Sequence, residues 1–331
     1  MSAWFELPDD RKKLIFEQTG ARLGLPPAAV EKDWWVTLTL QSIFELPLAD
    51  RIVFKGGTSL SKGWNLIQRF SEDIDLAIDR ESFGFAGSLG KKKITKLRKT
   101  IRNFVLEEFT PTLEEKLKEK GADVTLQVNP NPNSDADPSK IEIQYPELTD
   151  RVSYLPPRVL VELSARSLFE PFEGRIIGPI INPMLDSVGL KFLEFEVPCV
   201  LPQRTFLEKI FLLHEEFQRN EEELRAERLS RHLYDLHKMM DENLATSALQ
   251  DEELYKGIIA HRGQFTRLAG IDYTNHLPGN VNLIPPPKVI ALWEADYRAM
   301  QENMIQEDSV SFGQLMKRME QLMERVNAIK F

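Results

Sequence analysis

The chain of 331 residues and 38.1 kDa is long enough to bury a substantial core in two domains, and its 42% hydrophobic and 28% charged content is typical of a globular protein. No run of residues has the length and apolarity of a membrane span or of a signal-peptide core, so we expect a cytoplasmic protein without membrane contact. A single cysteine excludes an internal disulfide and a cysteine zinc cluster, and the net charge of −9 means that any RNA binding must come from a local basic patch.

The first fifty residues predict two helices that pack on the core. The first covers residues 9–23, and the second covers residues 27–46, where a proline suits the first helical turn. The charged run Glu31, Lys32 and Asp33 lies near the start of the second helix. Its composition alone places these three side chains on a solvated helix face.

A pair of glycines then follows a short apolar run, residues 52–54, that predicts a buried strand. After Gly56 and Gly57, the apolar side chains of Leu60, Trp64 and Ile67 recur at helical spacing. Thr58 or Ser59 has the right side chain to cap that helix. The beginning of a helix carries unpaired N–H groups and partial positive charge, and residues without side chains let a phosphate approach it. The pattern therefore predicts half of a nucleotide site, in which Gly56, Gly57, Thr58 and Ser59 hold the triphosphate.

The other half is an acidic strand at residues 71–78. Strand side chains alternate between faces, so Asp73 and Asp75 point the same way while Ile74 and Leu76 point into the core. Two neighbouring carboxylates repel each other unless a cation lies between them. Magnesium on two carboxylates and on substrate phosphates is the usual arrangement for nucleotidyl transfer, so the pair predicts a divalent-metal site.

At these residues the chain resembles a known family. The pattern Gly-Gly-Thr, a spacer and Asp-x-Asp is similar to the signature of the polymerase-β-type nucleotidyltransferase superfamily, and FKGGTSL...RFSEDIDL resembles the AbiEii/AbiGii toxins. The resemblance implies an α+β fold, with a mixed sheet flanked by helices, a nucleoside triphosphate substrate and a two-ion Mg²⁺ site. Asp73 follows Gly57 by sixteen positions, which is longer than the most compact spacing in the superfamily. Between them, Lys62 and Arg69 would suit nucleotide phosphates or a carboxylate partner.

A long helix is predicted at residues 91–120, interrupted or kinked near Pro111. Its first turns carry basic side chains without one acidic residue: Lys91, Lys92, Lys93, Lys96, Arg98, Lys99 and Arg102. A solvated face explains this run as well as RNA binding does. Its position soon after the Asp-x-Asp strand favours RNA binding, because a substrate strand that leads into a magnesium site needs a basic lining.

Further extended runs are predicted to complete the sheet, and they cover residues 122–128, 140–145 and 158–165. The polar, proline-rich residues 129–138 predict an exposed hairpin loop. Glu162 is a lone carboxylate in an apolar strand, so it needs a cation or a hydrogen-bonding neighbour. The resemblance implies that it is the third acid of the metal site, as in polymerase-β-type enzymes. A structural salt bridge is the alternative, and Glu142 is the rival for the role.

Beyond Pro202 the composition becomes helical, which predicts a nucleotidyltransferase domain at residues 1–200 and a C-terminal helical domain at residues 201–331. Before this boundary, residues 175–200 predict short extended pieces, and residues 184–192 suit a strand or a helix. The C-terminal helices are expected at residues 204–218, 228–240, 251–261, 287–303 and 311–329.

Two segments of the C-terminal half resemble further motifs of the toxin family, TFLEKIFLL and RLSRHLYDLHKM. The resemblance implies that Lys209 neutralises charge as pyrophosphate leaves and that Asp235 orients this lysine or acts as a base. From the residues alone, Asp235 also suits a buried pair with an arginine. His232 and His237 stand five positions apart, so they lie on different helix faces and do not predict a metal pair.

Together these features predict a magnesium-dependent enzyme that moves a nucleotide from a nucleoside triphosphate to an acceptor hydroxyl. The resemblance implies the toxin of a bacterial toxin–antitoxin or phage-defence pair, with a cognate antitoxin encoded nearby and the 3′ end of tRNA as acceptor. Two alternatives stay open from the sequence. One is transfer to a protein hydroxyl, as in adenylylation, and the other is a nucleotidyltransferase fold that holds nucleotide or RNA without catalysis.

Overall fold

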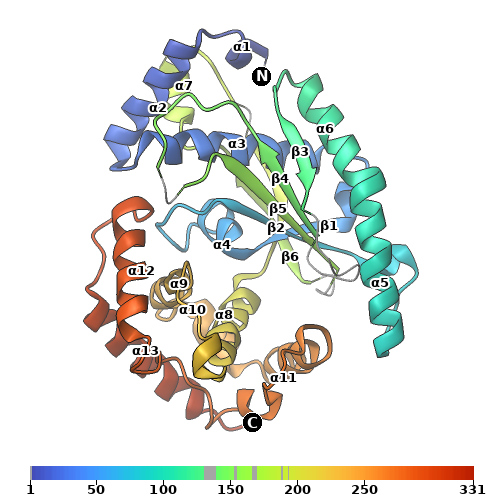
Figure 1. Ribbon diagram of the computed structural model, residues 1–331, viewed down its shortest axis with the longest axis vertical. Helices are drawn as coiled ribbons and strands as arrows, with labels where there is room; N and C mark the ends of the chain where they lie inside the picture. The colour runs from blue at the N-terminus through green and yellow to red at the C-terminus, as the bar shows by residue number, and fades with distance from the viewer. Residues whose placement is uncertain (1, 130–138, 153–154, 166–169, 188, 193) are drawn as a thin grey trace. The chain divides into compact units, whose positions relative to one another are not determined.

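The computed structural model describes residues 2–129, 139–152, 155–165, 170–187, 189–192 and 194–331 (Figure 1). The chain divides into two compact units: the first contains Met1–Asn65 and Arg69–Val200, and the second contains Leu66–Gln68 and Leu201–Phe331. Within the second unit, the backbone N–H of Gln306 donates to the carbonyl of Gln68 at 2.9 Å. This bond ties the short piece from the first half of the chain to the C-terminal half.

The first unit is built on a mixed β-sheet. Its strands are β1 (Ile52–Lys55), β2 (Asp73–Ile78), β3 (Thr125–Val128), β4 (Ser139–Gln144), β5 (Arg158–Ser164), β6 (Phe172–Ile177) and β7 (Phe195–Val200). In the described residues they form one seven-stranded sheet with the order β3-β4-β5-β2-β1-β7-β6. β2 runs parallel to β5 and β1 runs parallel to β7, whereas the other neighbouring strands are antiparallel. The mixed sheet confirms the predicted fold class.

The first unit also contains helices. They are α1 (Ser2–Phe5), α2 (Asp9–Leu23), α3 (Pro27–Phe44), α5 (Lys91–Phe104), α6 (Thr110–Glu119) and α7 (Asn182–Ser187). α3 contacts β2, β5, α2 and α6, and Figure 1 shows it running across the sheet. Residues 29–43 of α3 are therefore buried without exception, including its charged side chains.

The long helix predicted at residues 91–120 has the predicted interruption. α5 ends at Phe104, a π-helical turn covers Val105–Phe109, and α6 begins with Pro111 in its first turn. Proline is tolerated there because the first N–H groups of a helix have no intrahelical partner. Residues 184–187, left open between strand and helix, are helical in α7. The hairpin loop predicted at residues 129–138 lies outside the described residues from residue 130 onward.

The second unit is helical. Its helices are α8 (Pro202–Phe217), α9 (Ser230–Met239), α10 (Asn243–Gln250), α11 (Glu252–His261), α12 (Ile290–Asn303) and α13 (Phe312–Asn327). α8 contacts α9, α10 and α11, so it forms the centre of this unit. Among the helices of the described residues, none is long and apolar enough to cross a membrane.

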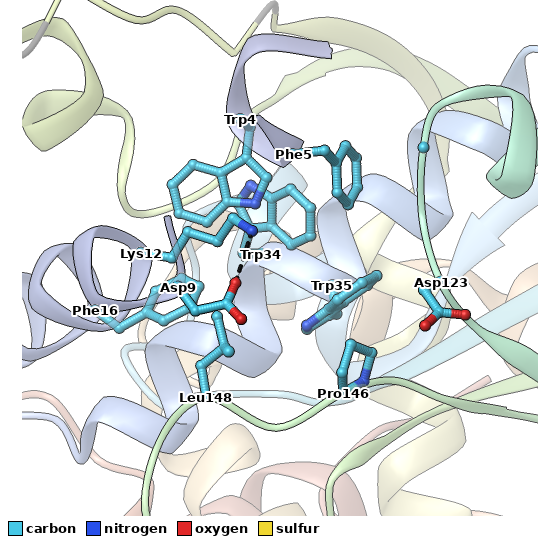
Figure 2. A pocket seen from close by; sticks show the side chains of 11 residues that line it. Trp4, Phe5, Asp9, Lys12, Phe16, Trp34, Trp35, Asp123, Pro146 and Leu148 are labelled. Carbon is cyan, nitrogen blue, oxygen red and sulfur yellow. Dashed lines mark hydrogen bonds and ion pairs between the residues drawn. The ribbon is translucent and has the colours of Figure 1, made fainter. Parts of the chain in front are cut away.

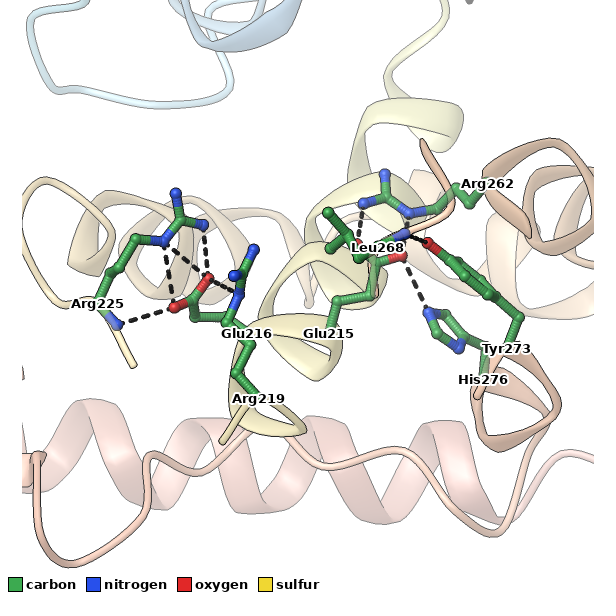
Figure 3. A network of polar contacts seen from close by, with 8 residues as sticks. All are labelled: Glu215, Glu216, Arg219, Arg225, Arg262, Leu268, Tyr273 and His276. Atoms are coloured by element: carbon green, nitrogen blue, oxygen red, sulfur yellow. Dashed lines mark hydrogen bonds and ion pairs between the residues drawn. The ribbon is translucent and has the colours of Figure 1, made fainter. Parts of the chain in front are cut away.

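Two adjacent carboxylates at the end of α8 are buried in ion-pair networks (Figure 3). Glu215 accepts a hydrogen bond from Nε of Arg262 at 2.6 Å and lies 3.1 Å from Nε2 of His276. Burial acts to raise the pKa of Glu215, but these two partners outweigh it and hold the pKa below its usual value. Glu216 is held by Arg225 at 2.6 Å. Because a buried carboxylate without a partner is costly, these pairs fix α8 to the segments that follow it.

Candidate active site

The glycine turn follows β1 directly and brings the backbone against an acidic side chain. Gly56–Thr58 form one α-helical turn, α4, which continues as a π-helical turn over Ser59–Gly63. Gly56 has a φ of +79°, and a Cβ built on it would lie 1.9 Å from Oδ2 of Asp75. Only glycine permits both this left-handed backbone and this close approach to the Asp75 carboxylate.

The predicted helix cap at Thr58 or Ser59 is wrong. The helical turn begins at Gly56, so both residues lie inside it, and both are buried. The Thr58 hydroxyl hydrogen-bonds to the hydroxyl of Ser71 at 2.9 Å and to the main-chain carbonyl of Asp73. Thr58 therefore ties the glycine turn to the beginning of β2.

The helix also ends earlier than its apolar spacing predicts, at Gly63 instead of near Ile67. A Cβ on Gly63 would lie 2.8 Å from Sγ of Cys199, so β7 packs directly against the end of the turn. The indole N–H of Trp64 donates to the carbonyl of Val200 at 3.1 Å. These contacts with β7, far along the chain, stop the helix.

Three acidic side chains share one face of the sheet. Asp73 and Asp75 are half-buried, and the alternating Ile74 and Leu76 are fully buried, which confirms the predicted alternation in β2. In the parallel pairing of β2 with β5, Asp75 stands directly opposite Glu162. Residues paired in this way point to the same side of a sheet, so Glu162 joins the two aspartates on their face.

Glu162 has a cation as its neighbour. Lys140 stands opposite it in the antiparallel pairing of β4 with β5, and its ammonium lies 2.5 Å from the Glu162 carboxylate. This ion pair is the structural salt bridge that the sequence analysis gave as the alternative to a metal-binding role for Glu162. The side chains of Lys140 and Glu162 are 44% and 22% exposed, so the pair is within reach of solvent. It is therefore weak, as surface ion pairs usually are.

The rival Glu142 lies farther from the aspartates. It stands opposite Leu160 in β5, and its carboxylate pairs with Arg158. Within the described parts of the chain, no three acidic, histidine or cysteine side chains lie close enough together to hold a metal ion by themselves. A metal on this face would rest on Asp73 and Asp75, with substrate oxygens or Glu162 as further ligands.

The charged run at the start of α3 is buried, which overturns its interpretation as a solvated face. Lys32 is 2% exposed and forms an ion pair with Glu72, the residue before Asp73. The same ammonium donates to the carbonyl of Pro156 at 2.8 Å. Lys32 therefore anchors the beginning of β2 next to the two aspartates.

Asp33 anchors the other side of the site. One of its carboxylate oxygens accepts a hydrogen bond from the Lys62 ammonium at 2.6 Å, and the other accepts from the backbone N–H of Ile180 at 2.8 Å. Lys62 belongs to the turn after the glycines, and its side chain is 8% exposed. Asp33 is thus a carboxylate partner of the kind that the sequence suggested for Lys62.

A signal for these buried charges was present in the sequence. Three consecutive helical residues spread over roughly 200° of the circumference, so they do not all face solvent on a helix that is apolar on either side of them. Glu31 is likewise buried with hydrogen-bonding partners. Its carboxylate accepts hydrogen bonds from the backbone N–H groups of Leu148 and Thr149.

Arg69 places a positive charge against the glycine turn. The residue is 2% exposed, and a Cβ on Gly57 would lie 2.8 Å from its Nη2. Its Nη1 donates to the carbonyl of Phe70 at 3.1 Å, which helps to fix the side chain. Gly57 therefore leaves the room that the guanidinium occupies beside the turn.

In the second unit, the two family motifs meet in a buried ion pair. The ammonium of Lys209 in α8 lies 2.8 Å from Oδ2 of Asp235 in α9, and the side chains are 6% and 0% exposed. The ammonium also lies 3.3 Å from Nδ1 of His232. Lys209 is thus a buried partner of Asp235. A catalytic role for either residue stays a prediction.

Comparison with known proteins gives one family and one fold. The family model described as "Nucleotidyl transferase AbiEii toxin, Type IV TA system" matches residues 39–324. The chain is similar in structure to the nucleotidyltransferase toxin MenT4 from Mycobacterium tuberculosis, with 18% identity, a TM-score of 0.51, and coverage of 95% of this chain and 90% of that one.

It is also similar to JHP933 from Helicobacter pylori, with 13% identity, a TM-score of 0.38, and coverage of 91% and 94% of the two chains. No curated protein sequence matches significantly. The family match includes the glycine turn, both aspartates of β2 and the buried pair of the second unit. The chain therefore belongs to the AbiEii family of nucleotidyltransferase toxins of type IV toxin–antitoxin systems.

Proposed function

We propose that this toxin transfers a nucleotide from a nucleoside triphosphate to the 3′ end of tRNA, with Mg²⁺ held by Asp73 and Asp75. The approach of the glycine turn to Asp75 carries the proposal. The first N–H groups of the turn and the Arg69 charge favour a phosphate at Gly56 and Gly57. That phosphate would adjoin the Asp75 carboxylate, and the two anions would repel each other unless a divalent cation lay between them.

Each residue of the site has a part in this proposal. Mg²⁺ supplies neutralisation of charge on the phosphates when it is bound. Asp73 and Asp75 provide its protein ligands, and the Lys32 and Thr58 contacts hold the beginning of β2 in place. Glu162 completes the site or, once its carboxylate has separated from Lys140, takes the proton of the acceptor hydroxyl.

The second unit has a part of its own. We assign Lys209 to neutralise charge on the leaving pyrophosphate and Asp235 to orient its ammonium, as their buried contact allows. The type IV family implies an antitoxin partner for the protein. We further propose that the toxin and its antitoxin serve in defence against phage.

The decisive experiment is incubation of the protein with each labelled nucleoside triphosphate and total cell RNA or lysate, with and without Mg²⁺. We expect one triphosphate to label tRNA at its 3′ end, and only when the metal is present. Label on protein would instead identify an adenylylating enzyme. Nucleotide binding without any labelled product would identify a fold that binds but does not catalyse.

A pair of matched glycine substitutions tests the approach to Asp75. Gly56 and Gly84 both have a φ of +79°, so the left-handed backbone alone should cost each alanine variant about 1–2 kcal/mol of unfolding free energy. A Cβ at Gly84 meets nothing within 4 Å, whereas a Cβ at Gly56 collides with the carboxylate. We expect Gly56→Ala to lose transfer and Gly84→Ala to keep it. Equal rates in the two variants, measured beside urea unfolding, would refute a role for this contact.

The basic run on α5 supplies a face for the RNA. Its apolar side chains Ile94, Leu97 and Ile101 are buried, and several lysines point to solvent: Lys91, Lys92, Lys93, Lys96 and Lys99. This separation leaves the ammonium groups free to contact a phosphate backbone, which is the sequence-independent part of RNA binding.

We expect Lys92→Glu to weaken tRNA binding and to lower the slope of log affinity against log salt by about one for each lost phosphate contact. The matched control is Lys317→Glu, because Lys317 is also an exposed helical lysine, on α13. Filter binding over a salt series measures both slopes. An unchanged slope in Lys92→Glu and in the triple reversal of Lys91, Lys92 and Lys93 would mean that this run is only a solvated face.

A further inference from the structure

The β6 end of the sheet exposes large apolar side chains, unlike its other end. Near β4, Trp35 of α3 stacks on Tyr145, and Figure 2 shows Trp35 beside the buried ring of Trp34. Among the strands that the structure describes, β6 is the last one on its side of the sheet, and its Phe172 and Ile176 are 43% and 60% exposed. Such an edge is a template for pairing with another strand.

The main chain of β6 presents hydrogen-bonding groups to this edge. Gly174 stands opposite Pro198 in the antiparallel pairing of β6 with β7. In such a ladder, every second residue exchanges two hydrogen bonds with the residue opposite, and proline has no N–H for the exchange. The exchanging residues of β6 are therefore Glu173 and Arg175. The N–H and C=O groups of Gly174 and Ile176 point away from β7, where a further strand can bind them.

Opposite charges stand on either side of Gly174, and both side chains point to the same face of the sheet. Glu173 is exposed, and its carboxylate has no ion-pair partner in the described parts of the chain. Nε of Arg175 donates to the carbonyl of Gly63 at 2.9 Å, and its Cζ lies 4.6 Å from the ring centre of Trp64. These contacts hold the guanidinium in place, and its other N–H groups remain to contact a carboxylate.

We propose that β6 pairs with β6 of a second copy of this chain, antiparallel, with a two-fold axis at Gly174. In this register Phe172 faces the partner's Ile176, Glu173 faces the partner's Arg175, and the two copies of Gly174 face each other. An aromatic ring thus meets a β-branched side chain, and a carboxylate meets a guanidinium. At the axis, two residues without side chains let the backbones approach.

The register and the occupant follow from the charges. Moving the axis by one residue, to Glu173 or to Arg175, would bring two like charges face to face. A strand of another protein requires no match between the two halves of β6, so this self-complementarity favours a second copy. Glu196 of β7 has its carboxylate over Gly174, but the residue is exposed, so the carboxylate turns to solvent when the copies meet.

The pairing extends the sheet and leaves the candidate active site alone. β7 and β1 stand between β6 and the acidic strand β2, so the interface uses no residue of the acidic face. The inference therefore does not rest on the proposed function, and transfer does not depend on it. Six residues from each copy form a small interface, so we expect a reversible dimer.

Sedimentation equilibrium of the full chain over a concentration series tests the proposal. We expect the average mass to rise from 38.1 kDa towards that of a dimer and no further, because the two-fold pairing uses the β6 edge of both copies. Glu173→Arg puts two arginines face to face in each of the two charge pairs, and it should weaken the dimer by at least about tenfold.

Glu107→Arg is the matched control, because Glu107 is an exposed carboxylate of the same unit outside the sheet. It makes the same change of charge and should leave the dimer unchanged. Equal dissociation constants for Glu173→Arg and Glu107→Arg would overturn the proposal. So would a chain that stays monomeric up to about 1 mM, or one that forms species larger than a dimer.

Mixing two variants tests the register itself. Arg175→Glu puts two glutamates face to face and should also weaken the dimer by at least about tenfold. In a mixture of Glu173→Arg with Arg175→Glu, each charge pair again joins opposite signs. The mixed dimer should therefore regain the wild-type affinity within about threefold. Two variants that unfold at the wild-type temperature but fail to pair when mixed would overturn the register.

Hydrogen exchange tests the edge without any substitution, which keeps the proposal open to refutation if Arg175→Glu does not fold. The amides of Gly174 and Ile176 should exchange more slowly above the dissociation constant of the dimer than below it. A dimer in which both amides exchange as in the monomer would overturn the pairing. Protection that arises only when the antitoxin is added would assign the edge to a strand of that partner and overturn the self-pairing.

Discussion

Asp75→Asn should reduce nucleotidyl transfer by at least about 10³-fold, and Asp73→Asn should do the same, because each removes a negative ligand from the face that holds the metal. Asparagine keeps the shape of the side chain at these half-buried positions, so the free energy of unfolding should change by less than about 1 kcal/mol. The transfer rate and urea unfolding, measured on the same preparation, check both statements. Toxicity in growing cells should disappear with the transfer activity.

Glu173→Gln is the control for this experiment. Glu173 is an exposed carboxylate on β6, in the same sheet but outside the acidic face. The same loss of one charge should leave transfer at the wild-type rate there. Transfer at the wild-type rate in Asp73→Asn or Asp75→Asn would end the metal assignment, whatever the behaviour of the control.

Lys209→Met should destabilise the protein by about 3–5 kcal/mol, because it takes the ammonium away from a carboxylate that is 0% exposed. The double variant Lys209→Met with Asp235→Leu removes both charges and should regain most of this stability, since apolar side chains of similar volume often replace a buried pair. Thermal and urea unfolding of the single and double variants measure the effect.

Lys238→Met on α9 is the matched control. Lys238 pairs with Glu307 at 2.8 Å, but their side chains are 26% and 30% exposed. Loss of this pair should cost no more than about 1 kcal/mol. Equal losses of stability in Lys209→Met and Lys238→Met would show that burial does not govern the Lys209 pair.

The double variant also separates folding from catalysis. If Lys209 stabilises charge on the leaving phosphates, the folded double variant should lose about 10²-fold to 10³-fold in transfer rate. Normal transfer by a stable double variant would confine the pair to a structural role. The active site would then consist of residues before Pro202.

Several features of this protein followed from local sequence alone. The helix Asp9–Leu23 has its predicted bounds, because a proline stands before it and Gly24 takes the left-handed conformation that ends it. The alternation of residues 73–76 followed from the geometry of an extended backbone. The helix predicted beyond Gly63 failed, because β7 packs against that point and nothing near it in sequence announces the contact.

The sequence by itself determined the family, the mixed α+β fold, the strand that carries Asp73 and Asp75, and the need of Glu162 for a partner. Only the tertiary structure decided that this partner is Lys140, that Asp235 pairs with Lys209, and that the charges of α3 are buried. A backbone pattern acts over a few neighbouring residues, so periodicity and turn residues reveal it. Strand register and helix packing join residues that stand tens of positions apart, and no local pattern contains those pairings.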